Sequence, residues 1–484
     1  MLFNSYLFIF LFFPVCMAGF FGLNHFRKFQ AARVFLFAMS MWFYGYFNPS
    51  YILIILSSIL INYLAYRYIN AHKESPSKKV AMILAVTANL LILGFYKYMD
   101  FFIENINTVF KTDYPLLHIM LPLGISFFTF QQISFVVDAY RNEVPDYDFI
   151  SYACFVSYFP QLIAGPIVSH KELVPQLMSE DNKTFSWDNF AKGAYLFILG
   201  LSKKVLLADV FGGAVPYGFT IAENLNSTTA WLVIFGYTIQ LYFDFSGYCD
   251  MAMGIGKMMN MDIPQNFNSP FKSKDMQELW GRWHMTLNRF LTSYVYIPLG
   301  GNRKGKFRTY LNVMIVFFLS GLWHGAAWTY VIWGLLNGVA VSLARMLKKP
   351  ISFNPRLVAA PINFVIWALL FVIFRAESFS QAFAIYRNAF SFDFGPIDYT
   401  YKEAFRVIEI KKVLAFTHIE GRFPYLILIG FYVTALFIIF GCKTAYSHMQ
   451  SFKPKVSNCI VSMFLLLWAI CSFAGKSVFL YFNF

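Results

Sequence analysis

Two histidines stand in apolar, tryptophan-rich sequence, where their side chains are suited to acid–base chemistry. One ends the motif Trp280-Gly-Arg-Trp-His284, and the other lies in Gly321-Leu-Trp-His324-Gly-Ala. The run 312–336 around His324 contains no Asp, Glu, Lys or Arg. An ionisable group at membrane depth is costly and tends to mark a site, and histidine gains and loses a proton near neutral pH. We interpret His324 as a base acting inside a membrane; the alternative is a histidine that bridges two helices through hydrogen bonds.

His284 differs from His324 in having charged neighbours. Arg282 and Arg289 are close to it in sequence, and Trp280 and Trp283 flank it. Residue types alone leave a structural role at the membrane interface and a catalytic role equally open.

The composition indicates a polytopic membrane protein. Of 484 residues, 58% are hydrophobic and 13% are charged, and the mean hydropathy is +0.53. At ~20 residues for each crossing, the apolar runs predict about 11–13 membrane segments, some of them re-entrant. The runs cover residues 5–23, 33–48, 51–66, 80–98, 116–137, 150–166, 190–210, 229–248, 312–323, 326–344, 358–374, 424–441 and 457–475. The predicted fold class is therefore all-α, a polytopic bundle of transmembrane helices.

The net charge of +14 is compatible with nucleic-acid binding or with a positive cytoplasmic face. Most basic residues lie in short loops between apolar runs, which is the pattern of positive-inside topology, so we predict no nucleic-acid partner. Basic loops at 67–79, 345–356 and 443–455 are predicted to be cytoplasmic, which leaves the carboxyl terminus outside. The six cysteines lack paired or zinc-type spacing, so we expect neither a disulfide framework nor a metal site.

The stretch 252–310 is too polar for an ordinary span. It carries nine Lys or Arg against three acids. We predict short amphipathic or re-entrant helices on the cytoplasmic face. Its basic residues, among them Lys272, Lys274 and Arg282, would attract a polyanionic donor such as a phosphate-bearing thioester. Attachment to anionic lipid headgroups explains the same charge equally well.

Two further features place polar groups among apolar runs. The segment 312–344 is too long for one crossing and lies between two basic loops, so a helix break is expected near Gly321–Gly325, beside His324. Gln240 and Asp244 are four residues apart and share a helical face. Asp244 would orient a histidine, pair with an arginine of the basic stretch, or form a structural polar contact between helices.

Six motifs stand in order along the chain. They are Leu121-Pro-Leu-Gly-Ile-Ser-Phe-Phe-Thr-Phe-Gln131, Phe159-Pro-Gln-Leu-Ile-Ala-Gly-Pro166, Tyr242-Phe-Asp-Phe-Ser-Gly-Tyr-Cys-Asp250, Phe267-Asn-Ser-Pro-Phe-Lys272, Trp280-Gly-Arg-Trp-His284 and Gly321-Leu-Trp-His-Gly-Ala326. Together they resemble the membrane-bound O-acyltransferase family, and most closely its bacterial alginate O-acetyltransferase branch. The resemblance extends from about Phe43 to the last residue. Many relatives have two arginines before the second Trp-His, where this chain has Gly281-Arg282.

The resemblance implies a single integral membrane domain over residues 1–484, built around a central tunnel. It implies that His324 is the catalytic base and His284 a second functional position. Backbone amides near Gly321 or Gly325, or a protonated His284, would stabilise the oxyanion. Arg282, Lys272 and Lys274 are expected to bind acetyl-CoA, which is the acyl donor. Asp244, Gln240 and Trp323 are expected to line the tunnel.

The last nine residues, 476–484, form an aromatic tail that is expected outside the membrane. The tail resembles the terminus of the small partner protein in teichoic-acid D-alanylation, whose tyrosine is thought to carry the acyl group. Tyr481 would then be a built-in relay nucleophile. The alternative is an aromatic anchor at the membrane interface.

The expected function is therefore transfer of acetyl from cytoplasmic acetyl-CoA across a bacterial inner membrane to an extracytoplasmic polysaccharide, alginate-like or another exopolysaccharide. The expected partners are membrane lipids and a secreted or anchored acetyltransferase that completes the reaction. D-alanine transfer to teichoic acid, and acetyl transfer to peptidoglycan or cellulose, remain alternatives. A transporter with a histidine proton relay is the non-enzymatic alternative, which the absence of inverted repeats disfavours.

Overall fold

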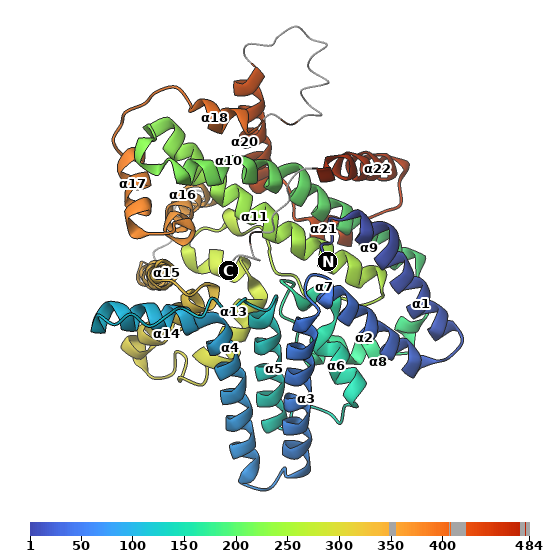
Figure 1. Cartoon of the computed structure of the whole chain (residues 1–484). Coiled ribbons are helices and arrows are strands. Elements are labelled where there is room, and N and C mark those ends of the chain that lie inside the picture. The colour runs from blue at the N-terminus through green and yellow to red at the C-terminus, as the bar shows by residue number, and fades with distance from the viewer. Residues whose placement is uncertain (348–354, 406, 408–422, 475–479, 481–484) are drawn as a thin grey trace. The chain divides into compact units, whose positions relative to one another are not determined.

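The computed structural model describes residues 1–347, 355–405, 407, 423–474 and 480, and Figure 1 shows its course. Helices make up the regular secondary structure of these residues, and no strand occurs among them. The predicted all-α class is thus confirmed. A helix satisfies its backbone hydrogen bonds within one segment, which is why long apolar runs destined for lipid fold in this way.

The chain divides into two compact units, of which the first comprises Met1–Phe197 and Cys249–Gln265. Within it, α3, α4 and α5 run side by side (Figure 1). The helices of this unit are α1 (Phe13–His25), α2 (Phe29–Gly45), α3 (Ser50–Ala71), α4 (Ser77–Phe110), α5 (Ile125–Tyr140), α6 (Phe149–Ser157), α7 (Phe159–Leu162), α8 (His170–Met178) and most of α9 (Trp187–Ser202).

The second unit comprises Ile198–Tyr248 and Asn266–Phe484, and it contains both candidate histidines. A π-helical turn, Lys203–Ala208, leads into its first helices. These and the later helices are α10 (Asp209–Thr220), α11 (Ser227–Met258, which ends in the first unit), α12 (Met276–Arg282), α13 (Met285–Leu291), α14 (Gly305–His324), α15 (Trp328–Met346), α16 (Pro355–Arg375), α17 (Phe379–Ala389), α18 (Tyr399–Glu403), α20 (Phe423–Gly441), α21 (Ala445–Gln450) and α22 (Val456–Cys471).

Several helices meet the requirements for crossing a membrane. By length and composition there are five such segments among the described residues, Phe8–His25, Ser50–Ala71, Ser77–Phe110, Val358–Arg375 and Pro424–Gly441. All five coincide with predicted apolar runs, and the chain is a multi-pass membrane protein. The larger number of about 11–13 segments stays a prediction.

Two of the predicted runs do not form continuous helices. The run 116–137 becomes helical only at Ile125, because Gly124 adopts a left-handed conformation with φ 72° directly before it. A Cβ atom at Gly124 would lie 2.7 Å from the carbonyl oxygen of Leu162, so this turn requires glycine. The run 150–166 is divided between α6 and α7, which are separated at Tyr158.

The expected break beside His324 is present. α14 ends at His324, Gly325 is extended with φ −167°, and α15 begins at Trp328. The two helices pack closely: a Cβ atom at Gly321 would overlap the carbonyl oxygen of Tyr330, and one at Gly334 would overlap that of Phe317. Small residues at a helix interface permit such close approach. Gly321 and Gly334 therefore permit the close packing of α14 on α15, the two helices of the hairpin whose turn follows His324.

The stretch 252–310 contains short helices, as its polarity predicts. Its first residues still belong to α11, which extends to Met258, so the irregular part begins later than expected. The rest includes α12, α13, a 3-10 turn at Pro270–Lys272 and a π-helical turn at Thr292–Tyr296. The cytoplasmic placement of this stretch remains a prediction.

Candidate functional site

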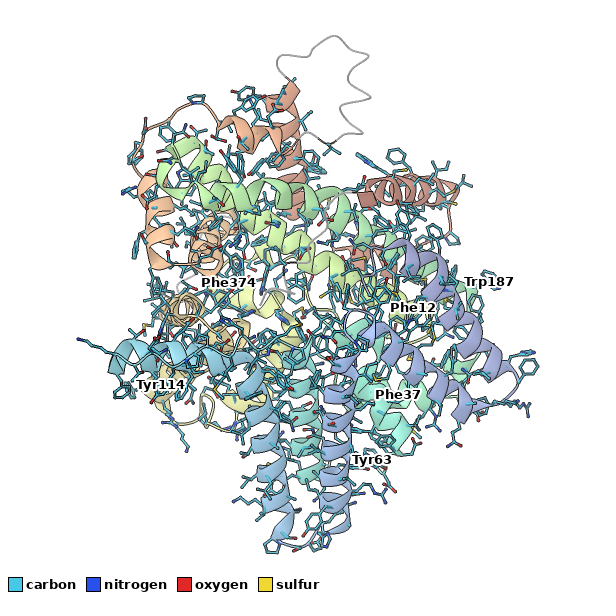
Figure 2. The ribbon with its side chains drawn as sticks, in the orientation of Figure 1. Phe12, Phe37, Tyr63, Tyr114, Trp187 and Phe374 are labelled. Carbon is cyan, nitrogen blue, oxygen red and sulfur yellow. The ribbon has the colours of Figure 1, made fainter. Side chains whose placement is uncertain are left out.

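His324 is held at the carboxyl end of α14, inside a cage of aromatic rings. The residue is 4% exposed. Its ring packs edge-on against Trp333 of α15, with centroids 5.1 Å apart, and against Phe374 of α16, 5.3 Å away. Phe374 is labelled in Figure 2. The carboxyl end of a helix carries partial negative charge and favours a nearby cation. The aromatic cage and the helix end thus define the surroundings of the His324 ring.

His284 is the N-cap residue of α13 and is 1% exposed. Its backbone is left-handed, with φ 46° and ψ 50°. A non-glycine residue in this region costs of order 1–3 kcal/mol, and such strain is concentrated at functional sites. The Nδ1 atom lies 3.1 Å from the side-chain oxygen of Asn266, and the ring of Phe245 packs edge-on 4.9 Å away. Asn266 and Phe245 therefore both help to fix the position of the imidazole.

One indole ring connects the two histidines. Trp323 precedes His324 in sequence, and the centroids of the two rings are 5.0 Å apart. The ring of Trp323 also meets that of His284 at 5.8 Å, with 67° between the planes. Trp323 itself is 4% exposed. The structure thus brings together three of the predicted site residues from two motifs of the sequence.

Burial determines the protonation state of His284, which lies outside the five candidate spans. Loss of solvent lowers its pKa from 6.5 to about 3. The ring is consequently neutral near pH 7. This argues against one of the sequence-based alternatives, in which a protonated His284 would stabilise the oxyanion.

Asp244, on α11, forms an ion pair with a lysine. Its Oδ1 atom is 2.5 Å from Nζ of Lys204, and both side chains are almost fully buried. Lys204 also contacts Asp209 at 2.7 Å, and the backbone N–H of Leu480 donates to Asp244 at 3.0 Å. A lysine, and not an arginine of the basic stretch or a histidine, is therefore the charged partner of Asp244. Sequence reasoning missed Lys204, although a lysine inside the apolar run 190–210 was a usable signal.

Gln240 is placed one turn from Asp244 on the same helix and is 5% exposed. Its amide group reaches α10, where a Cβ atom at Gly212 would lie 3.0 Å from Nε2. The predicted common face of Gln240 and Asp244 is thus a buried face in the second unit. Their assignment to a tunnel wall stays a prediction.

The three basic residues assigned to the donor have different surroundings. Arg282 pairs with Glu278 at 2.7 Å, one turn earlier on α12. Lys272 donates to the carbonyl oxygen of Cys442 at 2.5 Å. Lys274 is exposed to solvent. Lys274 is therefore the one of the three that is best placed to meet a soluble anion, while Arg282 and Lys272 also support the local fold.

Tyr481 lies outside the described residues, as does the rest of the aromatic tail except Leu480. The hydrogen bond from Leu480 to Asp244 is the described contact nearest to it in sequence. The relay role of Tyr481 remains a prediction.

Comparison with known proteins adds to this geometry. Residues 138–379 match the model of the membrane-bound O-acyltransferase family. The chain is 38% identical to a peptidoglycan O-acetyltransferase of Helicobacter pylori, over 100% of this chain and 98% of the relative. It is 39% identical to a probable alginate O-acetylase AlgI of Pseudomonas aeruginosa, over 81% and 75% of the two chains. A teichoic acid D-alanyltransferase of Bacillus subtilis is 27% identical over 60% of this chain and 73% of its own length.

Proposed function

The chain belongs to the membrane-bound O-acyltransferase family, and from that premise we propose that it moves acetyl from cytoplasmic acetyl-CoA to a glycan outside a bacterial inner membrane. The family makes it an O-acyltransferase enzyme. The single observation that carries the site assignment is the placement of His324 and His284 against one indole ring.

Peptidoglycan is the acceptor that we favour. The peptidoglycan O-acetyltransferase matches this chain from end to end, whereas the alginate O-acetylase matches 81% of it at nearly the same identity. End-to-end similarity includes both terminal segments of this chain. An exopolysaccharide is the second candidate, supported by the 39% identity to the alginate O-acetylase.

The proposed chemistry begins with deprotonation of an attacking hydroxyl group. His324 takes its proton while the hydroxyl oxygen forms a bond to the thioester carbonyl carbon. The tetrahedral intermediate then collapses, the C–S bond breaks, and the thiolate of coenzyme A leaves with a proton returned from the imidazolium. The carboxyl end of α14 stabilises that imidazolium.

The oxyanion needs hydrogen-bond donors in the same place. The backbone N–H of Gly325 is our candidate, because its contact to the carbonyl oxygen of Gly321 is long, at 3.4 Å. A side chain at position 325 would overlap the ring of Tyr330, so glycine is required beside this amide. His284, being neutral, does not supply a charged donor.

The attacking hydroxyl is proposed to be the phenol of Tyr481, which would then carry acetyl as an aryl ester to an extracytoplasmic transferase. This step would leave coenzyme A on the cytoplasmic side and move only acetyl through a tunnel. The ordinary pKa of a phenol is near 10, so a base such as His324 is needed for the attack.

Purified protein in detergent or liposomes, incubated with acetyl-CoA labelled in the acetyl group, tests the proposal. We expect release of free coenzyme A and transfer of label to protein or to added glycan. In cells, deletion should remove base-labile acetate from isolated peptidoglycan. A protein that moves solute across liposomes but never cleaves acetyl-CoA would support the transporter alternative instead.

A further inference from the structure

The side-chain oxygen of Asn266 is surrounded by donors from one short segment. It lies 3.1 Å from Nδ1 of His284, 3.2 Å from the backbone nitrogen of Thr286 and 3.0 Å from the hydroxyl oxygen of Thr286. Asn266 is fully buried. No motif in the sequence singled it out, although it directly precedes Phe267-Asn-Ser-Pro.

The backbone nitrogen of Thr286 fixes the orientation of this amide group. A backbone N–H only donates, so the Asn266 atom facing it must be the carbonyl oxygen and not the amide nitrogen. An amide oxygen only accepts. Nδ1 of His284 must therefore carry the proton in the bond that it makes to the same oxygen. A neutral imidazole has one ring proton, so Nε2 carries the lone pair.

The backbone of Asn266 holds the same segment a second time. Its carbonyl oxygen accepts from the N–H of Met285 at 2.9 Å, and the N–H of Asn268 donates to the carbonyl oxygen of Arg282 at 2.9 Å. These two bonds pair residues 266–268 with 282–285. They hold the backbone on both sides of His284, so Asn266 both supplies the acceptor for the ring and, together with Asn268, helps to fix the backbone that carries it.

We propose that Asn266 is a positioning residue of the acyltransfer site: it keeps the ring proton of His284 on Nδ1 and makes Nε2 an acceptor for an O–H or N–H group of a substrate. The nitrogen that bears the proton is set by the bond that the other nitrogen makes. Burial, which keeps the ring neutral, agrees with this arrangement. The catalytic part of the proposal rests on the proposed function, whereas the tautomer rests on geometry alone.

Three asparagine variants test the catalytic part. Asn266→Leu removes the acceptor at similar volume, and we expect kcat to fall roughly 10- to 100-fold, by analogy with the loss seen when a metal-ligating histidine is deprived of the partner that orients its ring, with KM for acetyl-CoA nearly unchanged. Asn266→Asp keeps an acceptor and should restore most of kcat. Asn62→Leu is the matched control: it removes another almost fully buried asparagine, on α3 of the first unit, whose oxygen accepts from the side-chain nitrogen of Asn89, and it should keep kcat near wild type.

The tautomer itself is measured by solid-state NMR of the full chain labelled with ¹³C,¹⁵N-histidine. The signal of His284 is identified by its absence in His284→Gln. We expect a proton on Nδ1 in the wild type and a shift of population towards Nε2–H in Asn266→Leu. If Asn266→Leu does not fold, the position of the ring proton in the wild-type spectrum still tests the proposed tautomer.

Two results overturn the proposal: an Nε2–H tautomer in the wild type, or normal kcat in a folded Asn266→Leu that has lost the Nδ1 proton. Failure of the proposed function is distinguishable from both. In that case the wild type would not cleave acetyl-CoA, and the tautomer would still be observed on Nδ1.

Discussion

The imidazole of His284 meets the indole of Trp323 edge to face, with ring centroids 5.8 Å apart and 67° between the planes. Trp323 in turn contacts His324 at 5.0 Å. Two sequence motifs, one on short helices and one at the end of α14, are thereby joined through a single aromatic side chain. Edge-to-face ring contacts contribute about 0.5–1.5 kcal/mol beyond the area they bury.

Trp323 is consequently expected to position both histidines. Trp323→Phe keeps an aromatic ring, so the protein should fold, but the smaller ring should loosen both contacts and lower kcat more than it raises KM. Trp323→Ala should also lose roughly 3–5 kcal/mol of stability. Kinetics and thermal unfolding of the two variants in one detergent provide the test. Unchanged kcat in Trp323→Phe would show that the indole fills space in the core but does not position the two histidines.

The ion pair between Lys204 and Asp244 is expected to support the fold more than the chemistry. Lys204→Met leaves two carboxylates without their cation, and breaking such a buried pair costs about 3–5 kcal/mol. Lys192→Met is the control, because Lys192 pairs with Asp188 on an exposed helix face and should lose at most about 0.3–0.5 kcal/mol. Chemical unfolding of both variants measures the difference. Equal losses would contradict a structural role for the buried pair.

Much of the local structure could be predicted from the sequence, because it depends on neighbouring residues. The break after His324 follows from Gly321, Gly325 and the length of the apolar run. The partner of Asp244 could not be predicted in this way, since Lys204 is forty positions away and only tertiary packing brings the two together. The same holds for Asn266, whose bond to His284 spans eighteen positions.

The interruption of the run 116–137 cannot be predicted from the sequence for a related reason. Hydrophobicity alone marks 116–137 as one run, but the turn at Gly124 is dictated by the backbone of Leu162, a contact that no hydropathy window contains. The polarity of 252–310 predicts short helices, and two seven-residue helices, α12 and α13, lie in it. It did not indicate that Arg282 pairs locally with Glu278.

Donor binding is expected to depend on Lys274. Because this residue is exposed, Lys274→Gln should raise KM for acetyl-CoA and leave kcat nearly unchanged, and added salt should reduce the difference from wild type. Lys453→Gln removes the same charge from another exposed lysine, outside 252–310, and is the control. Initial rates at several salt concentrations give KM for acetyl-CoA of the wild type and both variants. If KM responds to neither the substitution nor salt, attachment to lipid headgroups becomes the better account of the basic stretch.

Tyr481 is expected to carry acetyl during transfer. Tyr481→Phe removes only the phenolic oxygen and keeps the aromatic ring, so delivery of acetyl to the outside should stop without loss of the protein. Intact-protein mass spectrometry after incubation with acetyl-CoA should show an acetyl group on the terminal peptide of the wild type. A fully active Tyr481→Phe variant with an unmodified wild-type terminus would reduce the tail to a membrane anchor. A cytoplasmic carboxyl terminus, shown by labelling, would also contradict the relay.

The central claim is that His324 acts as the base, and turnover of labelled acetyl-CoA by His324→Ala tests it most directly. The account predicts normal membrane insertion and a loss of 10²–10⁴-fold in kcat, the usual contribution of a general base. His448→Ala, which removes an exposed histidine outside the motifs, should keep wild-type turnover. Retention of more than about a tenth of wild-type turnover by His324→Ala would contradict the account, because a general base contributes at least about a hundredfold.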